Sequence, residues 1–409
     1  MGKLSAFLRA KRTKKTTLTA SDKPRNEYYE NVSVRMGTAQ VVLYLLLLAF
    51  IVLSLLFNTE LITYRNFYLF FQDLNASAET VDIFSTDSIS YPVADEQSFA
   101  VYRKGLAVAG NSSVTVFSAT GRQIVSESVN YRKPVAVGTG KYLLVYEMGG
   151  LQYSLYNSYT KIHSGKSEYP ISGAAVSESG MYALCSAGKD STTVVSLYSE
   201  RFNLLGRYTK SGYVTGVAID DGGEMLAILA LNPDGGLLST ELMLAKPGES
   251  EAHARVSFSQ TAGLACTFTA SGRVAVLCDD GVRYVSRRGE VREKYGFEGR
   301  TLAAFALGED GVCVALKKSE VSPKNVVIVF DKNGKIVYNE DAGEEVVAIS
   351  RCGDSVFWMT KRGVACMDLN DGTRSFKSCN TTDRALLAVS EREALCCSAQ
   401  KAYYVSFRN

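Results

Sequence analysis

The sequence predicts an all-β fold, a β-propeller of about eight four-stranded blades, preceded by one transmembrane helix. Three observations lead to this prediction. Residues 38–57 form an uncharged, largely apolar run. From Phe99 onward, short strands with alternating apolar residues are separated by Gly, Asp, Asn and Ser. A unit of apolar strand, polar turn and apolar strand then recurs at intervals of roughly 40 residues, the length of one four-stranded blade.

Residues 1–37 are predicted to be a basic cytoplasmic tail. This segment contains nine basic and three acidic residues. Four of the basic residues form a cluster, Lys11, Arg12, Lys14 and Lys15, and Arg35 lies just before the apolar run. Lys and Arg are retained on the cytoplasmic side of a membrane, so the N-terminus is expected inside and the C-terminal body outside. The tail is either a topology signal alone or also a lipid-facing basic surface that attracts anionic headgroups.

The run at residues 38–57 is predicted to be a transmembrane helix that acts as a signal anchor. Twenty residues at about 1.5 Å per residue cover the roughly 30 Å core of a bilayer. A cleaved signal peptide would have a shorter apolar region and a small-residue cleavage site, and neither occurs here. The positions expected to span the membrane include Thr38, Val41, Leu45, Leu48, Ile51, Leu55 and Phe57.

The remaining chain divides into a juxtamembrane connector, residues 58–80, and an extracytoplasmic propeller, residues 81–409. Aromatic residues of the connector suit either the outer headgroup level or the underside of the propeller. The last of the eight units holds only three strands before the C-terminus. We expect residues 81–85 to supply the fourth strand and so to close the ring, because closure removes open sheet edges. Seven blades is the alternative if one unit has been counted twice.

Glycine marks the turn in seven of the eight units, and Ala394 takes its place in the last. These blade-turn glycines are Gly105, Gly140, Gly180, Gly222, Gly272, Gly311 and Gly353. A second set of turns, at Gly121, Gly334 and Gly372, is expected in the outer hairpins, where a residue with positive φ is required.

The outer hairpins ATGRQ at residues 119–123 and DLNDG at residues 368–372 resemble those of quinoprotein-type (PQQ-like) and WD-like propeller repeats. The order of basic tail, single span and propeller resembles a family of uncharacterised bacterial single-pass membrane proteins. Quinoprotein repeats carry a docking tryptophan in each blade, whereas Trp358 is the one tryptophan of this chain. The Gly-His and Trp-Asp signatures of WD repeats are absent too, so the resemblance implies no quinone cofactor.

The residues that would carry chemistry are sparse. His163 and His253 are the two histidines, and both fall in polar, loop-like segments. The nine cysteines show no CxxC or zinc-type spacing, so buried free thiols are favoured, with a disulfide between Cys352 and Cys366 or Cys379 as the alternative. No catalytic, cofactor or metal residue is therefore assigned. Carboxylate pairs that suit glycoside hydrolysis occur at residues 220–221, 279–280 and 344–345, where solvated turn acids are the simpler interpretation.

The sequence favours a membrane-anchored extracytoplasmic binding, scaffold or sensor protein that interacts through its propeller loops. The expected partners are the lipid bilayer and an extracytoplasmic protein or glycan. Nucleic acid is not expected, because the net charge of +3 leaves the part beyond the tail mildly acidic. One alternative is a propeller-type enzyme acting on cell-wall or extracellular glycans. The sequence favours a protein without enzyme activity but does not decide the point. Another is a tail that recruits cytoplasmic partners.

Overall fold

The computed structural model describes residues 27–57, 88–157, 160–189, 192–234, 237–249, 251–379 and 383–407. The tail residues Lys11, Arg12, Lys14 and Lys15, the connector at 58–80 and the expected closing strand at 81–85 lie outside the described residues. The chain divides into two units, Met1–Ala76 and Ser77–Asn409, and each is described by itself.

The described part of the first unit is one helix, α2, which spans Glu27–Phe57 and has 31 residues. It contains the whole run predicted to cross a membrane. Four consecutive leucines, Leu45 to Leu48, are each more than half exposed, so apolar side chains face all sides of the helix. The side chains of Ile51, Leu55 and Phe57 lie outside the described residues. Among the residues that the structure describes, no helix combines the length and apolar character needed to cross a membrane.

The second unit is a β-propeller of eight four-stranded antiparallel sheets, which confirms the predicted all-β propeller and the higher blade count. Blades 1 to 4 consist of β2 Gln97–Tyr102, β3 Gly105–Gly110, β4 Ser113–Phe117 and β5 Gln123–Ser128; β6 Pro134–Gly138, β7 Tyr142–Glu147, β8 Gln152–Asn157 and β9 Thr160–Lys166; β10 Ile171–Val176, β11 Tyr182–Ala187, β12 Thr193–Tyr198 and β13 Leu204–Lys210; and β14 Tyr213–Ile219, β15 Leu226–Asp234, β16 Leu237–Ala245 and β17 Ala254–Ser259.

Blades 5 to 8 continue the same order in the C-terminal half. They consist of β18 Gly263–Phe268, β19 Val274–Cys278, β20 Gly281–Val285 and β21 Val291–Gly296; β22 Leu302–Gly308, β23 Gly311–Lys317, β24 Asn325–Phe330 and β25 Ile336–Asp341; β26 Val346–Cys352, β27 Ser355–Thr360, β28 Gly363–Asp368 and β29 Arg374–Ser378; and β30 Ala385–Ser390, β31 Glu393–Cys397, β32 Lys401–Ser406 and β1 Ser88–Ser90.

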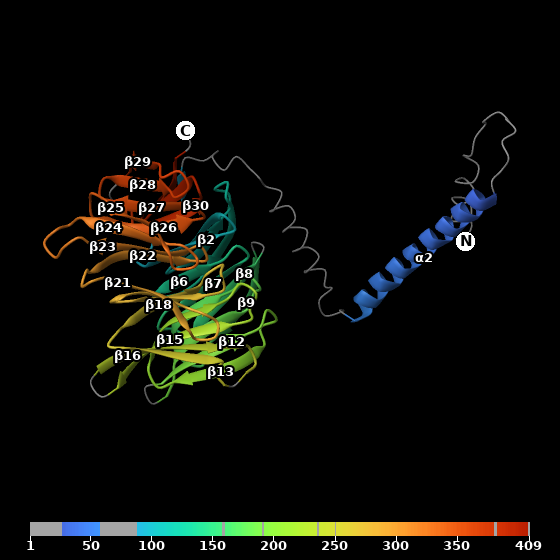
Figure 1. The fold of residues 1–409 in the computed structure, drawn as a ribbon, viewed down its shortest axis with the longest axis horizontal. Coiled ribbons are helices and arrows are strands. Elements are labelled where there is room, and N and C mark those ends of the chain that lie inside the picture. The colour runs from blue at the N-terminus through green and yellow to red at the C-terminus, as the bar shows by residue number, and fades with distance from the viewer. Residues whose placement is uncertain are drawn as a thin grey trace. The chain divides into compact units, whose positions relative to one another are not determined.

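The first strand of every blade lies innermost. β2, β6, β10, β14, β18, β22, β26 and β30 each contact the next in this order, and β30 contacts β2 to complete the circle. Figure 1 shows β2 of the first blade next to β30 of the last. The ring therefore has no open edge between its first and last blades.

The ring is closed by β1, which pairs antiparallel with β32 as the outer strand of blade 8. The expectation that both chain ends share the last blade is confirmed, but the strand is Ser88–Ser90 rather than residues 81–85. Its neighbour Tyr91 extends the join, because its backbone N–H and its hydroxyl donate to the carbonyls of Gln400 and Ser398. The short segment S-I-S lacks a long apolar run, which explains why the sequence pattern did not mark it.

Each junction between neighbouring blades has its own apolar core. The described buried residues form eight clusters, one for each pair of adjacent blades. The middle strands are buried on both faces, as in β19 and β27, where every residue is buried. Continuous apolar strands such as Val274–Cys278 are therefore required, and they are the signal that made the repeat visible in the sequence.

Five successive inner strands carry a β-bulge at the same place, near their N-terminal ends. The register shifts leave Ser172, Thr215, Leu264, Ala303 and Val347 unpaired, in β10, β14, β18, β22 and β26. All five side chains are exposed, as expected where a bulge turns a residue out of the sheet pattern.

Candidate functional site

The best candidate for a functional surface is one end of the ring, which we call the hairpin mouth. It is formed by the turns that join the first and second strands of the blades, such as residues 177–181, 220–225 and 309–310. Neighbouring turns touch one another: the N–H of Ser179 donates to the carbonyl of Asp221 over 3.1 Å, and that of Ala270 donates to Glu309 over 2.8 Å. These contacts fix the turns as a continuous rim.

Acidic side chains gather on this rim from blades that are distant in sequence. Glu178 belongs to blade 3, Asp221 to blade 4, and Glu309 and Asp310 to blade 6. Two of the four have structural partners, because Glu178 accepts a hydrogen bond from the N–H of Gly140 and Asp310 accepts one from Gly353 at 2.9 Å. Asp221 and Glu309 have no ion pair among the described residues.

The electrostatics of the two unpaired acids reflect their crowding. Partial burial raises the pKa of Glu309, and the negative charges of Asp221, Asp310 and Glu178 raise it further. Partial burial also raises the pKa of Asp221, followed by the charges of Glu178 and Asp220. The hairpin mouth thus concentrates negative charge that its own residues do not neutralise, which favours a cationic ligand or a basic protein segment.

The turns of blades 1 and 2 add basic side chains to the rim. In the turn of blade 1, Arg103 and Lys104 both have positive φ, 50° and 59°. These two residues form the two-residue turn between β2 and β3, and a hairpin turn of type I′ requires positive φ at both of its central residues. Lys104 is exposed here, and Lys141 is exposed in the turn of blade 2. The hairpin mouth therefore carries basic as well as acidic side chains.

The blade-turn glycines all lie at or beside these turns, but they meet different needs. Gly180, Gly272, Gly311 and Gly353 have positive φ. In blade 4 the residue with positive φ is Gly223 rather than its neighbour Gly222. Gly105 is required for a different reason, since a Cβ there would collide with the carbonyl oxygen of Phe117. The outer-hairpin glycines Gly121, Gly334 and Gly372 have positive φ, as their turn type demands.

The three predicted carboxylate pairs are scattered. Asp221 reaches the hairpin mouth, while the adjacent Asp220 is buried and pairs with Arg287 at 2.7 Å. Asp280 binds Arg283 at 2.7 Å, and the acids at 344 and 345 pair with Arg362 and Lys361. Sequence reasoning missed Glu178, Glu309 and Asp310, because only the closed ring brings blades 3, 4 and 6 together.

The two histidines differ from each other. His253 is exposed. His163 lies in the outer strand β9 and stacks on Phe202 with ring centroids 4.3 Å apart. Burial lowers its pKa. The expectation that it occupies a polar loop is wrong, because alternate residues of β9 face the neighbouring blade.

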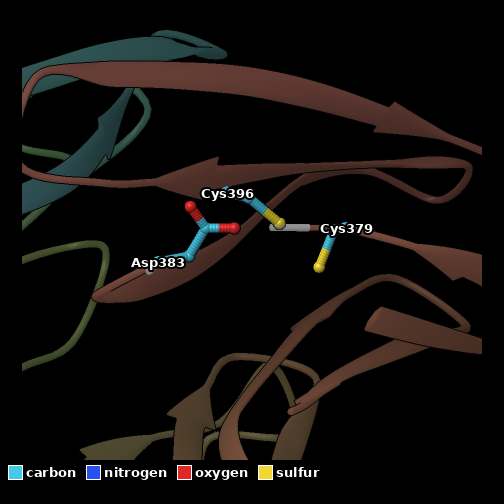
Figure 2. A group of neighbouring side chains, drawn as sticks. All are labelled: Cys379, Asp383 and Cys396. Atoms are coloured by element: carbon cyan, nitrogen blue, oxygen red, sulfur yellow. The ribbon is translucent and has the colours of Figure 1, made fainter. Parts of the chain in front are cut away.

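One group of side chains offers metal ligands that the sequence did not suggest. The ligand atoms of Cys379, Asp383 and Cys396 all lie within 4.8 Å of one another. Figure 2 shows them side by side, with the carboxylate of Asp383 next to the sulfur of Cys396. The spacing C-x3-D could have been noticed, but Cys396 joins only through sheet pairing. All nine cysteines are free thiols, so the alternative disulfide of Cys352 is not formed.

Pockets also lie between blades, and the charged side chains that line them form ion pairs with one another. A pocket of about 530 Å³ between blades 1 and 2 is lined by Glu127, Tyr131, Lys161 and Lys166. Lys161 forms an ion pair with Glu127, which also accepts a hydrogen bond from Tyr156 at 2.8 Å. A similar pocket between blades 3 and 4 contains the pair Lys210–Glu241 at 2.5 Å. These pairs are satisfied within the protein.

Taken together, the closed ring and its strand order define an eight-bladed propeller of the WD40-like type, and solved structures support this class. The C-terminal WD40 domain of Sif2 is similar with a TM-score of 0.58 at 12% identity, over 79% of this chain and 97% of that one. Sqt1 from Chaetomium thermophilum gives 0.52 at 13% identity, over 79% and 99%. Saccharomyces cerevisiae Sqt1 gives 0.51 at 10% identity, over 80% and 100%. At these identities the likeness establishes the fold alone.

The chain belongs to the family of unknown function DUF5711, whose profile matches residues 80–402. This match covers the whole described propeller except its last residues. No curated protein matches the chain.

Proposed function

We propose that this protein is a membrane-anchored propeller that binds a partner protein outside the cytoplasm through its hairpin mouth. The observation that carries the proposal is the convergence of Asp221 and Glu309 on a rim made rigid by hydrogen bonds between blades. Neither carboxylate has an ion-pair partner among the described residues. A rigid ring of turns with uncompensated charge is suited to recognition, because binding requires little reordering. The partner segment is expected to be basic.

The anchoring part of the proposal rests on the sequence of α2 and its flank. Residues 38–57 contain no charge, and the excess of Lys and Arg before them, including Arg35, favours an inside N-terminus. The structure describes the side chains of residues 35–50 and of Val52, which include only part of the twenty-residue run. Those that are described, such as Leu43 and Leu46, expose their apolar surface. The bacterial origin implied by the resemblance stays a prediction.

Crosslinking on native membranes tests the binding role. Proteins are crosslinked, purified through a C-terminal tag and identified, for the wild type and for Asp221→Asn with Glu309→Gln. The double variant is expected to lose a partner that the wild type retains. The matched control is Glu320→Gln, an exposed acid in the loop between β23 and β24, at the other end of the blades; it is expected to retain the partner. Equal recovery by both variants would contradict a role for the hairpin mouth.

Protease protection tests the anchoring separately. A tag at the C-terminus should be cleaved by protease added to intact cells or spheroplasts, whereas a tag at Met1 should be protected. Protection of both tags, or cleavage of the N-terminal tag alone, would refute the proposed orientation without touching the binding result.

A specific observation also favours the alternative of a glycan-acting enzyme. Such an enzyme requires carboxylates around one mouth, and a raised pKa suits Glu309 to act as a general acid. Screening the full chain against cell-wall fragments, with Glu309→Gln as control, separates the two functions. Hydrolysis by the wild type that is lost in the variant would favour the enzyme; its absence in both would leave the binding role.

The tail remains a second candidate for partner recruitment. Deleting residues 1–22 while retaining Arg25 and Arg35 removes the lipid-facing candidates Lys11, Arg12, Lys14 and Lys15 but preserves a basic flank. A truncated protein that inserts correctly and keeps its partner would reduce the tail to a topology signal.

A further inference from the structure

We propose that Cys379, Asp383 and Cys396 form a binding site for one zinc ion at the junction between blades 7 and 8. Cys379 follows β29, the outer strand of blade 7. Asp383 precedes β30, and Cys396 lies within β31 of blade 8. An ion bound to all three would join the two blades at the point where the ring approaches its closure.

The geometry suits a tetrahedral ion. The two sulfurs and a carboxylate oxygen lie within 4.8 Å of one another. Zinc binds thiolate sulfur at about 2.3 Å, so two sulfurs on one ion are separated by about 3.8 Å. The groups would therefore move together by about 1 Å at most, which a side-chain rotation of the half-buried Cys379 can supply. Two thiolates with one carboxylate are ligands that zinc accepts readily.

The hydrogen bonding of Asp383 points to a missing positive partner. Its Oδ2 accepts a hydrogen bond from the hydroxyl of Tyr403, while its Oδ1 is buried and has no hydrogen-bond partner among the residues that the structure describes. A buried carboxylate oxygen without a partner is unfavourable, because the water it has lost is not replaced. A metal ion at this place would satisfy Oδ1, and Tyr403 would hold the carboxylate in position, as partners of metal ligands commonly do.

A disulfide between Cys379 and Cys396 explains these observations less well. It would join the two sulfurs but leave Asp383 beside a neutral pair, with its Oδ1 still unsatisfied. The third side chain in the group, shown in Figure 2, is what favours a cation. Binding would deprotonate the two thiols and release their protons to solvent.

The test is direct measurement of metal content. The full-length chain is purified with a reductant that does not bind metals, stripped with a chelator, incubated with zinc chloride and dialysed, and its zinc is then counted. One zinc per chain is expected. Cobalt(II) in place of zinc should give the charge-transfer absorption of a metal–thiolate bond, a signature that non-specific surface binding does not produce.

Matched variants locate the site. Cys379→Ser and Asp383→Asn are expected to weaken zinc binding at least tenfold, since each loses one of three ligands. Cys352→Ser is the control, because Cys352 is also a partly buried cysteine at a strand end but lies outside the group; it should bind zinc as the wild type does. Asp383→Asn keeps an oxygen that can accept from Tyr403, so it is expected to fold.

Three results would overturn the proposal. The wild type could retain no zinc, the variants could bind it as tightly as the wild type, or mass spectrometry of the protein purified without reductant could find Cys379 and Cys396 joined, with two hydrogens lost, and no metal bound after reduction. The last result would identify the group as a disulfide site.

Discussion

Two junctions between blades carry polar side chains at corresponding positions, but they differ in whether the charged group has a partner of opposite charge. Between blades 4 and 5, Arg283 is the third residue of the third strand, β20, and it contacts Thr261 in the connecting loop. Between blades 7 and 8, Tyr403 is the third residue of the third strand, β32, and it contacts Asp383 in the connecting loop. The same position thus presents a cation in one blade and a phenol in the other.

At the first junction the buried charge is fully paired. Arg283 is 4% exposed, and its two terminal nitrogens bind the two oxygens of Asp280 at 2.8 and 2.7 Å. Its guanidinium also lies 5.1 Å from the ring centre of Phe258. A bidentate pair with a stacked ring satisfies an arginine almost completely.

At the second junction the carboxylate of Asp383 has a hydroxyl partner; among the described residues it has no ion pair, and its Oδ1 has no hydrogen bond. The thiols of Cys379 and Cys396 lie beside it. The comparison indicates that a charged side chain can be buried between two blades when a residue of the same junction carries the opposite charge. Where it does not, the counter-charge is expected to come from a bound ion.

Among the substitutions, the largest loss of stability is expected from breaking the paired junction. Asp280→Ala leaves the guanidinium of Arg283 buried without its carboxylate. Breaking a fully buried pair costs about 3–5 kcal/mol, and because Asp280 is itself partly exposed we expect a loss of about 2 kcal/mol. The free energy of unfolding is measured by denaturant titration. The double variant Asp280→Ala with Arg283→Met removes both charges and should recover most of the loss; a single variant as stable as the wild type would contradict the pairing argument.

Zinc should stabilise only the second junction. An ion that binds the folded protein alone, at a concentration 100 times its dissociation constant, adds about 2.7 kcal/mol to the free energy of unfolding. The wild type and Asp280→Ala should both gain this increment, since the junctions are far apart in the ring. Cys379→Ser should gain at most about 1.4 kcal/mol at the same zinc concentration, because a dissociation constant raised at least tenfold leaves zinc at no more than about 10 times that constant. Thermal melting with and without zinc measures the gain, and an equal gain in Cys379→Ser would place the ion elsewhere.

The sequence predicted the ring far better than these junctions. Apolar middle strands such as Val274–Cys278 repeat because every blade buries both faces, so the pattern is local and periodic. The closing strand Ser88–Ser90 is three residues long and depends on pairing with β32, which no local signal encodes. Asp221 and Glu309 belong to different blades, and Cys396 meets Cys379 only through tertiary packing. Contacts set by the closing of the ring are not periodic, and they were therefore missed.

Acid should act mainly on the paired junction. The hydrogen bond from Arg283 holds the pKa of Asp280 below its ordinary value of 3.8. A carboxyl with a lowered pKa contributes stability above its ordinary pKa and loses it as the pH falls through the folded value. Because Asp280 is partly exposed, the loss is expected to be below about 1 kcal/mol. The free energy of unfolding is measured from pH 6 down to pH 3, and it should fall less steeply for Asp280→Asn than for the wild type. Parallel curves would show that the pKa of Asp280 is the same in the folded and unfolded protein.

The smallest expected effect is the most informative about the unpaired junction. In metal-free protein, Asp383→Asn removes a charge that has no ion-pair partner in the described part of the chain, while keeping an oxygen that can accept from the hydroxyl of Tyr403. We expect the free energy of unfolding to change by less than about 0.5 kcal/mol, in contrast to the loss in Asp280→Ala. Denaturant titration in the presence of a chelator measures it. A loss as large as that of Asp280→Ala would mean that a group within the protein already neutralises Asp383, and the contrast between the two junctions would then disappear.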